Sequence, residues 1–325
     1  KFQTFQADKI VNREASKANY QLASTDKNES QYEMLKKLEL SKDAYTRLKN
    51  YCDEKGIDFL STAFDEESLN FLHKDLGLKT LKIPSGEVTN APLVLSHACT
   101  SSNLIVSTGM ANMQEIKDVL GVIAFGYLNK NVFAPLSKNS FIDAFHSREG
   151  KDILKRKVTL LHCTSEYPAP LEEVNLRAMN SIKNEFDISI GYSDHTSGIY
   201  VSLAAVAMGA NIIEKHFTLD KSMPGPDHLS SLEPKELTAM ISAIRKIEVS
   251  LGSHNKIPSS SEILNLQSIR KSLVAETRIK KGDMFSKQNI SIKRPGNGLS
   301  PYEYWNICGR IAAKDYEKGE LIENK

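Results

Sequence analysis

The fold class of this chain follows from two stretches of its sequence, ISIGYSDHT at residues 188–196 and IIEKHF at residues 212–217. Each is a short apolar run that leads into a histidine, His195 in the first and His216 in the second. Residues 200–208 between them are mostly apolar and precede a glycine, which is typical of a short buried helix. The order strand, helix, strand predicts two adjacent parallel strands about 4.8 Å apart, with one imidazole at the carboxyl end of each.

The two histidines together indicate a metal site. One histidine at a strand end is more often a hydrogen-bonded structural residue, but two at equivalent depths on neighbouring strands can reach the same ion. Asp194 and Glu214 flank them, and the loop at residues 224–227 follows closely. Structural zinc sites usually take all four ligands from the protein, whereas two histidines leave positions for water or substrate. We therefore predict a catalytic divalent metal site on His195 and His216.

Strand-like runs alternate with helical segments along most of the chain. Besides the two quoted above, such runs end near residues 2–4, 59–62, 81–85, 105–108 and 160–164. Seven strands that alternate with helices are one short of a (β/α)8 TIM barrel, an α/β fold. The sequence opens at Lys1 in what reads as the end of a strand, so we expect the first β/α unit to precede it.

The composition changes after a long helix that is expected to end at Gly252. The next stretch is rich in serine, asparagine and lysine and reads as a linker. Short β-like runs and turns follow, and two Lys-Gly-acid segments at residues 281–283 and 318–320 look like a repeat of one turn. We predict three parts: a barrel domain at residues 1–252, a linker at 253–271 and a small β-rich domain at 272–325.

The overall composition excludes several classes of protein. The 325 residues carry a formal charge of +2, and no run of lysine or arginine suggests a nucleic-acid surface. The four cysteines include no CxxC pair, which argues against a thiolate metal site or a disulfide framework and fits a reducing cytoplasm. No apolar run approaches the roughly 20 residues needed to cross a bilayer, so no membrane association is expected.

One long stretch does not fit a simple barrel. Residues 125–157 join a helix to the next strand and contain the aromatic residues Phe125, Tyr127, Phe133, Phe141 and Phe145. Connections of that kind lie on the face opposite the active site. We expect an oligomer contact or an extra packing layer there, and not a lid over the histidines.

Residues suited to binding a phosphate or a hydroxyl group follow almost every predicted strand. Singly, a serine or threonine at a strand end is a common turn former, but strand ends converge at the mouth of a barrel. The residues expected around the two histidines are Lys1, Gln3, Thr62, Lys82, Ser85, Ser107, Ser165 and Ser193. Glu87 and Asp227 are the carboxylates best placed to act as acid or base or to bind a polyol, and Tyr167 adds a ring or hydroxyl contact.

The other histidines are given no metal role. His162 is interpreted as a buried strand residue and His228 as a loop residue. His73 and His97 fall in expected helices, and we predict that both lie at the surface.

Seven ordered motifs resemble those of the bacterial sialic acid synthases, the N-acetylneuraminate synthase family that includes the legionaminic acid synthases. The motifs are KFQTF at 1–5, KIPSGE at 82–87, STGM at 107–110, SDHT at 193–196, EKHFT at 214–218, PD at 226–227 and KRPGNG at 293–298. The resemblance covers nearly the whole chain. It implies a β/α barrel joined to a small antifreeze-like (SAF) domain, in a homodimer in which each SAF domain caps the barrel of the partner.

The resemblance also implies a reaction. Phosphoenolpyruvate condenses with the open-chain aldehyde of an N-acetylated amino sugar, giving a nonulosonic acid and inorganic phosphate. A divalent metal on His195 and His216 would polarise the aldehyde oxygen, while Lys1, Lys82 and the serines would hold the phosphate. The family favours Mn²⁺, with Mg²⁺ or Co²⁺ as alternatives, although imidazole ligands alone would equally admit zinc or cobalt.

Similarity to the family assigns further residues around the sugar. It places Gln3, Tyr167, Asp227 and the partner's Arg294 near the amino sugar. It places Glu87 near the reacting centre. In a swapped dimer Arg294 can act although it is far from the barrel motifs in the sequence.

Two features depart from the family pattern. The family's first strand, with its active-site glutamate, is absent from the sequence, and a chain that began at Lys1 is expected to have an open barrel. Ser165 stands where some sialic acid synthases carry asparagine, in the context TSEYPAP at 164–170, which is closer to the legionaminic acid branch. The sugar is therefore N-acetylmannosamine or a 6-deoxy diacetamido relative of it.

Two other functional classes compete with this interpretation. A metal-dependent barrel hydrolase commonly shows a His-x-His pair on an early strand, and the chain has no such pair. In a non-enzymatic protein the small domain would bind ice or glycan and the barrel would be a scaffold. Release of phosphate from phosphoenolpyruvate in the presence of an amino sugar distinguishes the three.

Overall fold

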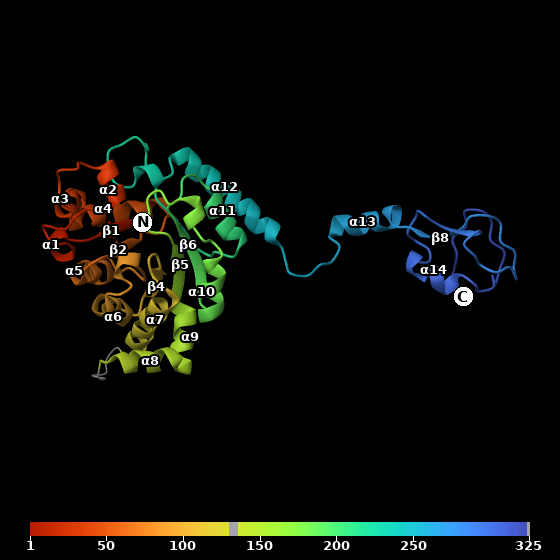
Figure 1. Cartoon of the computed structure of the whole chain (residues 1–325), viewed down its shortest axis with the longest axis horizontal. Coiled ribbons are helices and arrows are strands. Elements are labelled where there is room, and N and C mark those ends of the chain that lie inside the picture. Colours follow the sequence, from red (N-terminus) through yellow and green to blue (C-terminus); the bar gives the residue numbers. More distant parts are fainter. Residues whose placement is uncertain (130–135, 324–325) are drawn as a thin grey trace. The chain divides into compact units, whose positions relative to one another are not determined.

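The computed structural model describes residues 1–129 and 136–323, which form two compact units, Lys1–Gly252 and Ser253–Lys325 (Figure 1). Seven strands form a parallel sheet in the first unit, and each strand pairs with the next one along the chain. The strands are β1 (Phe2–Thr4), β2 (Ser61–Ala63), β3 (Thr80–Ile83), β4 (Asn103–Ser107), β5 (Val158–Cys163), β6 (Ser189–Asp194) and β7 (Ile213–Lys215). The sheet is curled, and every strand expected for the barrel is present, so the predicted barrel class is confirmed.

Helices follow the strands, and several of them begin at capping residues in the sequence. The helices that follow β1 to β7 in turn, or join them, are α4 (Lys42–Lys55), α5 (Glu66–Asn70), α6 (Ala91–Cys99), α7 (Met113–Leu128), α9 (Arg148–Lys157), α10 (Ala178–Phe186), α11 (Tyr200–Ala207) and α12 (Pro234–Leu251). Ser41, Asp65 and Asn112 accept backbone N–H groups at the starts of α4, α5 and α7, which satisfies donors that a helix cannot pair internally. No helix in the described part of the chain has both the length and the apolar character to span a bilayer.

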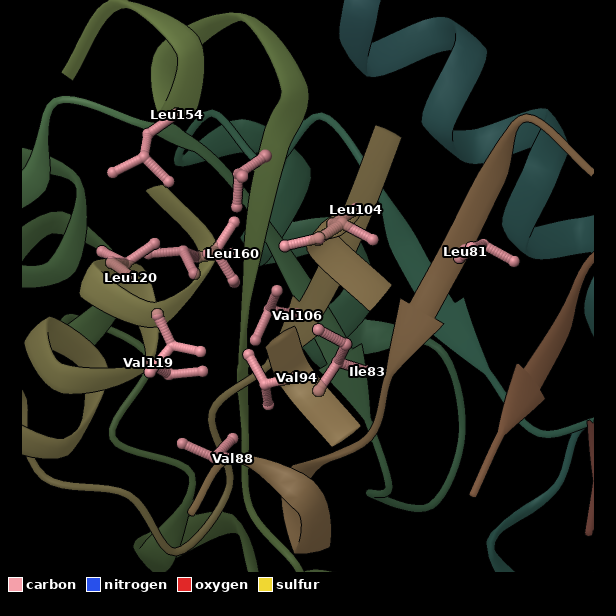
Figure 2. Close-up of a cluster of buried hydrophobic side chains, with 14 of the residues drawn as sticks. Leu81, Ile83, Val88, Val94, Leu104, Val106, Val119, Leu120, Leu154 and Leu160 are labelled. Carbon is pink, nitrogen blue, oxygen red and sulfur yellow. The ribbon is translucent and has the colours of Figure 1, made fainter. Parts of the chain in front are cut away.

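The core of the first unit lies between the sheet and these helices. Branched aliphatic side chains of the strands, among them Ile83, Val106 and Leu160, pack with Val94 and Leu120 of the helices (Figure 2). These side chains are at most 1% exposed. Each fully buried aliphatic side chain contributes about 1.5–3 kcal/mol of transfer free energy, so the core holds the strand ends in fixed positions.

Three short helices lie in the connection between β1 and α4. They are α1 (Ala7–Ile10), α2 (Asn19–Ser24) and α3 (Gln31–Leu38). Residues Ser30 and Glu33 form a reciprocal capping box that starts α3. Most side chains of α2 and α3 are only partly buried, so this connection covers the strand ends without adding to the main core.

The long segment before β5 forms an extra packing layer. Helix α8 (Lys138–His146) lies against α7, and the ring centres of Phe125 and Phe141 are 5.2 Å apart. A Cβ atom on Gly121 would lie 2.8 Å from the Phe141 carbonyl oxygen, so only glycine allows this close approach. The predicted packing layer is confirmed for Phe125, Tyr127, Phe141 and Phe145, whereas Phe133 lies outside the described residues.

The second unit is small and β-rich. Strands β8 (Ser272–Ala275) and β9 (Ile290–Lys293) are antiparallel, and a second core forms around residues such as Leu273, Phe285 and Tyr316. The two Lys-Gly-acid segments adopt similar turns, with φ angles of 94° at Gly282 and 88° at Gly319. A short helix, α14 (Tyr304–Ile307), packs here as well.

The segment predicted as a linker contains a helix. Helix α13 (Ser260–Ile269) begins at Ser259, whose side chain accepts the Glu262 N–H while the Glu262 carboxylate accepts the Ser259 N–H. The serine cluster at 259–261 therefore acts partly as a helix cap.

The expectation that His97 lies at the surface was wrong. Its side chain is 1% exposed on the inner face of α6. The ring can be buried because Nδ1 donates a hydrogen bond to the Leu93 carbonyl, one helical turn back, at 2.9 Å. Burial lowers the pKa of His97 from 6.5 to about 4. At neutral pH the ring is uncharged, and it must stay uncharged for α6 to pack.

This burial predicts an acid-dependent loss of stability. Because His97 binds a proton more readily in the unfolded chain, the free energy of unfolding falls as the pH drops from about 6.5 towards 4, by about 1.4 kcal/mol per pH unit. His97→Leu removes this titration. The change in its free energy of unfolding per pH unit should therefore be smaller than that of the wild type by about that amount. Urea unfolding followed by circular dichroism at several pH values measures the slopes. His146→Leu, at an exposed position of α8, is the control, and equal slopes for wild type and His97→Leu would contradict the assignment.

Candidate active site

A cavity of about 400 Å³ opens at the carboxyl ends of the strands. That size suits two small substrates together, since ligand sites usually span about 300–1,000 Å³. The predicted residues that line it are Lys1, Gln3, Thr62, Lys82, Ser85, Ser107, Ser165, Tyr167, Ser193, His195, His216 and Asp227. The barrel topology therefore brings together side chains that are spread over most of the first unit.

The two histidines lie side by side. In the register of β6 and β7, Asp194 is opposite Lys215, so His195 and His216 follow the two strands at equivalent positions. Their ring centres are 5.4 Å apart, with an interplanar angle of 68°. The Nδ1 atom of His195 lies 2.7 Å from the Thr164 carbonyl oxygen. A carbonyl can only accept, so Nδ1 carries the proton and Nε2 of this ring has a free lone pair.

Burial keeps both rings uncharged. It lowers the pKa of His195 below its usual range and lowers the pKa of His216 to about 3, where the neighbouring His195 also contributes. Nδ1 of His216 is 3.6 Å from a carboxylate oxygen of Asp227. At neutral pH the pair therefore offers lone pairs and not positive charges, as metal binding requires.

A buried ion pair fixes the ends of the two strands. Lys215 Nζ lies 3.2 Å from Asp194 Oδ2, and both side chains are almost fully buried. Asp194 also accepts hydrogen bonds from the Thr196 N–H and hydroxyl at 2.8 and 2.7 Å and from the Ser202 hydroxyl at 2.6 Å. Lys215 Nζ donates in addition to the Thr196 carbonyl. The residues on both sides of His195 are thus held in place.

The basic part of the cavity is organised by Glu214. Lys82 Nζ donates to both carboxylate oxygens of Glu214, at 2.8 and 2.9 Å, and Lys1 Nζ lies 3.2 Å away. The Ser193 hydroxyl donates to the same carboxylate at 3.0 Å. Burial alone would raise the pKa of Glu214, but Lys82 and Lys1 outweigh it and hold this pKa well below its usual range. Two ammonium groups therefore converge on one carboxylate at the floor of the cavity.

Sequence reasoning did not include Glu214 among the site residues. The signal was available, because Glu214 precedes His216 by two residues and alternate residues of a strand point to the same face. The sequence alone does not give the register of β6 and β7, which sets Glu214 opposite Ser193.

Two hydroxyl groups of the cavity are buried without a partner. These are Thr62 Oγ1 and Ser107 Oγ, which make no hydrogen bond within the described residues. Buried polar atoms nearly always make a hydrogen bond. Two buried hydroxyl groups that line a cavity and have no partner therefore indicate a polar ligand. Beside them, the Ser85 hydroxyl accepts the Gly109 N–H at 3.0 Å. Together with the two lysines, these groups suit an anion such as a phosphate.

The other side of the cavity is formed by residues that sequence reasoning missed. Tyr20 and Gln21 of α2 and Met34, Leu35 and Leu38 of α3 line it. The ring of Tyr20 is 4.8 Å from that of Tyr167, which in turn is 4.1 Å from the ring of His195. The connection after β1 therefore supplies a wall next to the histidine pair.

Comparison with known proteins identifies the family. Residues 1–256 match the NeuB family, and residues 270–325 match the SAF domain. The chain belongs to the NeuB family. This confirms the resemblance inferred from the sequence motifs, including the SAF domain at the carboxyl end.

Relatives of this NeuB chain carry informative names. It is 48% identical to the N,N'-diacetyllegionaminic acid synthase of Campylobacter jejuni, over 99% of this chain and 89% of that protein. It is 43% identical to the enzyme of the same name from Legionella pneumophila, over 99% of this chain and 84% of that protein. Among solved structures it is similar to an N-acetylneuraminic acid synthetase from Leptospira borgpetersenii, at 31% identity and a TM-score of 0.61, with 76% of each chain covered.

Two predicted site residues of the NeuB chain are not among the described residues that line the cavity. Glu87 is in a short 3-10 helix (Ser85–Glu87), where its carboxylate accepts a hydrogen bond from the Asn90 side chain at 2.6 Å, and it is not among the lining residues. Arg294 belongs to the second unit, and the described residues that line the cavity belong to the first. Its Nε donates to the Ile269 carbonyl at 3.0 Å, and its side chain is exposed.

Proposed function

We propose that this protein condenses phosphoenolpyruvate with the open-chain aldehyde of an N-acetylated amino sugar, as a transferase that forms a carbon–carbon bond. The products are a nonulosonic acid and inorganic phosphate. The observation that carries the proposal is the neutral histidine pair beside a floor with two ammonium groups, in one cavity. The names of the relatives support the same chemistry. Because phosphoenolpyruvate is a cytoplasmic metabolite, we propose a cytoplasmic location for the enzyme.

The basic floor suits phosphoenolpyruvate. Lys1 and Lys82 supply positive charge, and Thr62 and Ser107 supply unpaired hydroxyl groups. Glu214 neutralises the lysines in the absence of substrate, which limits the cost of keeping two buried cations together. When the anion binds, the lysines can donate to its oxygens while Glu214 still accepts from Ser193.

The histidine pair fits a divalent metal. With a metal–nitrogen bond of about 2.1 Å, two imidazoles that share an ion have ring centres roughly 5–6 Å apart, which agrees with the observed 5.4 Å. Within the described residues no group of three or more His, Cys, Asp or Glu side chains is arranged to hold an ion. Water and substrate oxygens would complete the coordination, as in catalytic sites. We propose Mn²⁺ as the metal, with Mg²⁺ or Co²⁺ as alternatives.

The chain's own residues position the sugar for the reaction. A divalent ion at the histidines would polarise the aldehyde oxygen. Tyr167 packs against His195, and Asp227 lies beside His216, so both can bind the sugar next to the reacting carbon, with Gln3 at the same mouth. Carbon 3 of phosphoenolpyruvate attacks the aldehyde carbon, a water adds at carbon 2, and loss of phosphate from that carbon leaves the 2-keto acid.

The central prediction is that phosphate release needs phosphoenolpyruvate, an amino sugar and a divalent metal together. The wild type should release phosphate from phosphoenolpyruvate only when an N-acetylated amino sugar and Mn²⁺ are both present. His216→Ala should lower kcat/KM by about a thousandfold, because polarisation by a metal is worth several kcal/mol. A colorimetric phosphate assay with mass spectrometry of the product measures both effects.

Controls separate this function from its competitors. His146→Ala, an exposed histidine of α8, should behave as wild type. Full activity after removal of metal would contradict the metal role. Sugar-independent hydrolysis, or no turnover at all, would instead favour the hydrolase or the scaffold.

We further propose a homodimer in which the SAF unit of one protomer caps the barrel of the other and supplies Arg294. Two observations and one general property of arginine support it. The Arg294 side chain makes no ion pair within the described residues. Tyr302 and Trp305 of the same unit are 88% and 78% exposed, which is unusual for large aromatic side chains unless a partner covers them. A guanidinium is also well suited to bind sugar or carboxylate oxygens.

A complementation experiment tests the swapped arrangement. Arg294→Ala should raise the sugar KM by about tenfold, the value of one hydrogen bond to a charged group, whereas Arg310→Ala, an exposed arginine of the same unit, should not. Co-expression of Arg294→Ala with inactive His216→Ala should then restore about a quarter of wild-type activity at low sugar concentration. In a swapped heterodimer one of the two sites has all its native residues. Failure of co-expression to restore activity above that of either variant would exclude the swap.

A further inference from the structure

One wall of the active-site cavity is mostly apolar, although the floor is charged. Its one amide, Gln21, is bonded to the Ala18 N–H and the Tyr20 hydroxyl, at 3.0 and 3.3 Å. Tyr20 of α2 and Met34, Leu35 and Leu38 of α3 face the cavity that also contains Lys1, Lys82 and the serines. Leu38 is 48% exposed, so much of its side chain is available to a ligand. A site built for phosphoenolpyruvate alone would have no need of this hydrocarbon surface.

The wall is preformed. Met34 is only 4% exposed and anchors α3. The Tyr32 hydroxyl and Lys36 Nζ donate to the Asp8 carboxylate of α1, at 2.8 and 3.2 Å. Glu39, just after α3, accepts the Ala7 N–H at 2.5 Å. Both ends of the apolar face are thus tied to the segment that leaves β1.

The chain between α2 and α3 is held in place as well. The buried ammonium of Lys17 donates to the Thr25 hydroxyl at 2.9 Å and to the Asp26 carbonyl. It also lies 3.6 Å from the Glu29 carboxylate. The chain between α2 and α3 is therefore fixed around one buried cation, which sets where Leu35 and Leu38 face.

The wall lies on the sugar side of the cavity. The ring of Tyr20 packs against that of Tyr167, and the ring of Tyr167 packs against that of His195, so the wall begins one ring away from the histidine pair. The lysines are instead gathered at Glu214. A sugar whose aldehyde lies at the histidines would extend past Tyr167 towards α3.

We infer that the wall formed by Tyr20, Met34, Leu35 and Leu38 determines sugar specificity. It selects an amino sugar with methyl and acetyl groups, a 6-deoxy diacetamido hexose, over N-acetylmannosamine, which carries hydroxyl groups in their place. A hydroxyl group against the side chains of Met34, Leu35 and Leu38 would lose its water without gaining a partner, whereas a methyl group buries apolar area. The inference rests on the proposed function and names the residues that choose its substrate.

Leu38 and Leu40 provide a matched test. The two leucines are 48% and 44% exposed and lie two residues apart, but only Leu38 lines the cavity. In the full chain with saturating phosphoenolpyruvate and Mn²⁺, phosphate release gives kcat/KM for each sugar. The wild type should prefer the 6-deoxy diacetamido sugar by at least about tenfold, the usual value of a small apolar contact. Leu38→Asn should reduce this preference about tenfold through loss on that sugar, while Leu40→Asn and Leu38→Met should keep it.

The outcomes are distinguishable. A preference that is unchanged in Leu38→Asn, or equal losses on both sugars, would overturn the role of the wall while leaving the condensation intact. A wild type that prefers N-acetylmannosamine would overturn it too. If the wild type released no phosphate with either sugar, the proposed function itself would fail, and this inference with it.

Discussion

The pairing of β6 with β7 is the constraint on which the site depends. The buried Asp194–Lys215 ion pair joins the last residues of the two strands, and His195 and His216 are the next residues of each. A slip of one residue would turn one set of side chains to the opposite face of the sheet and separate the rings. Removing one partner of such a pair leaves an uncompensated buried charge, which costs about 3–5 kcal/mol. The ion pair therefore makes the observed register much more stable than its alternatives.

The second constraint is electrostatic. A site for a substrate with several negative charges needs cations, yet cations buried without a partner are unstable. Glu214 resolves this conflict, because one carboxylate holds both Lys1 and Lys82 at the floor of the cavity. Its strand neighbour Lys215 is used differently, as a structural cation that pairs with Asp194. Of these adjacent residues of β7, Glu214 thus serves the cavity and Lys215 the scaffold, because side chains alternate between the two faces along a strand.

Most of the floor could be predicted from the sequence, because strand ends in a β/α barrel converge whatever lies between them. That rule located the histidines, both lysines and the hydroxyl groups. Glu87 was predicted by the same rule, but it lies in a turn of 3-10 helix after β3, where its side chain pairs with Asn90. The apolar wall could not be predicted, since its position depends on how α1 and α3 pack together and not on any strand. His97 was misjudged because its single intrahelical hydrogen bond, which permits burial, leaves no pattern in the sequence.

The central claim is that His195 and His216 bind one metal ion together. Pulsed electron paramagnetic resonance of the Mn²⁺-loaded protein measures it most directly, because nitrogen nuclei of bound imidazoles couple to the electron spin of the ion. The account predicts coupling to two imidazole nitrogens in the wild type and to one in His216→Ala. Coupling to one nitrogen or to none in the wild type would contradict it.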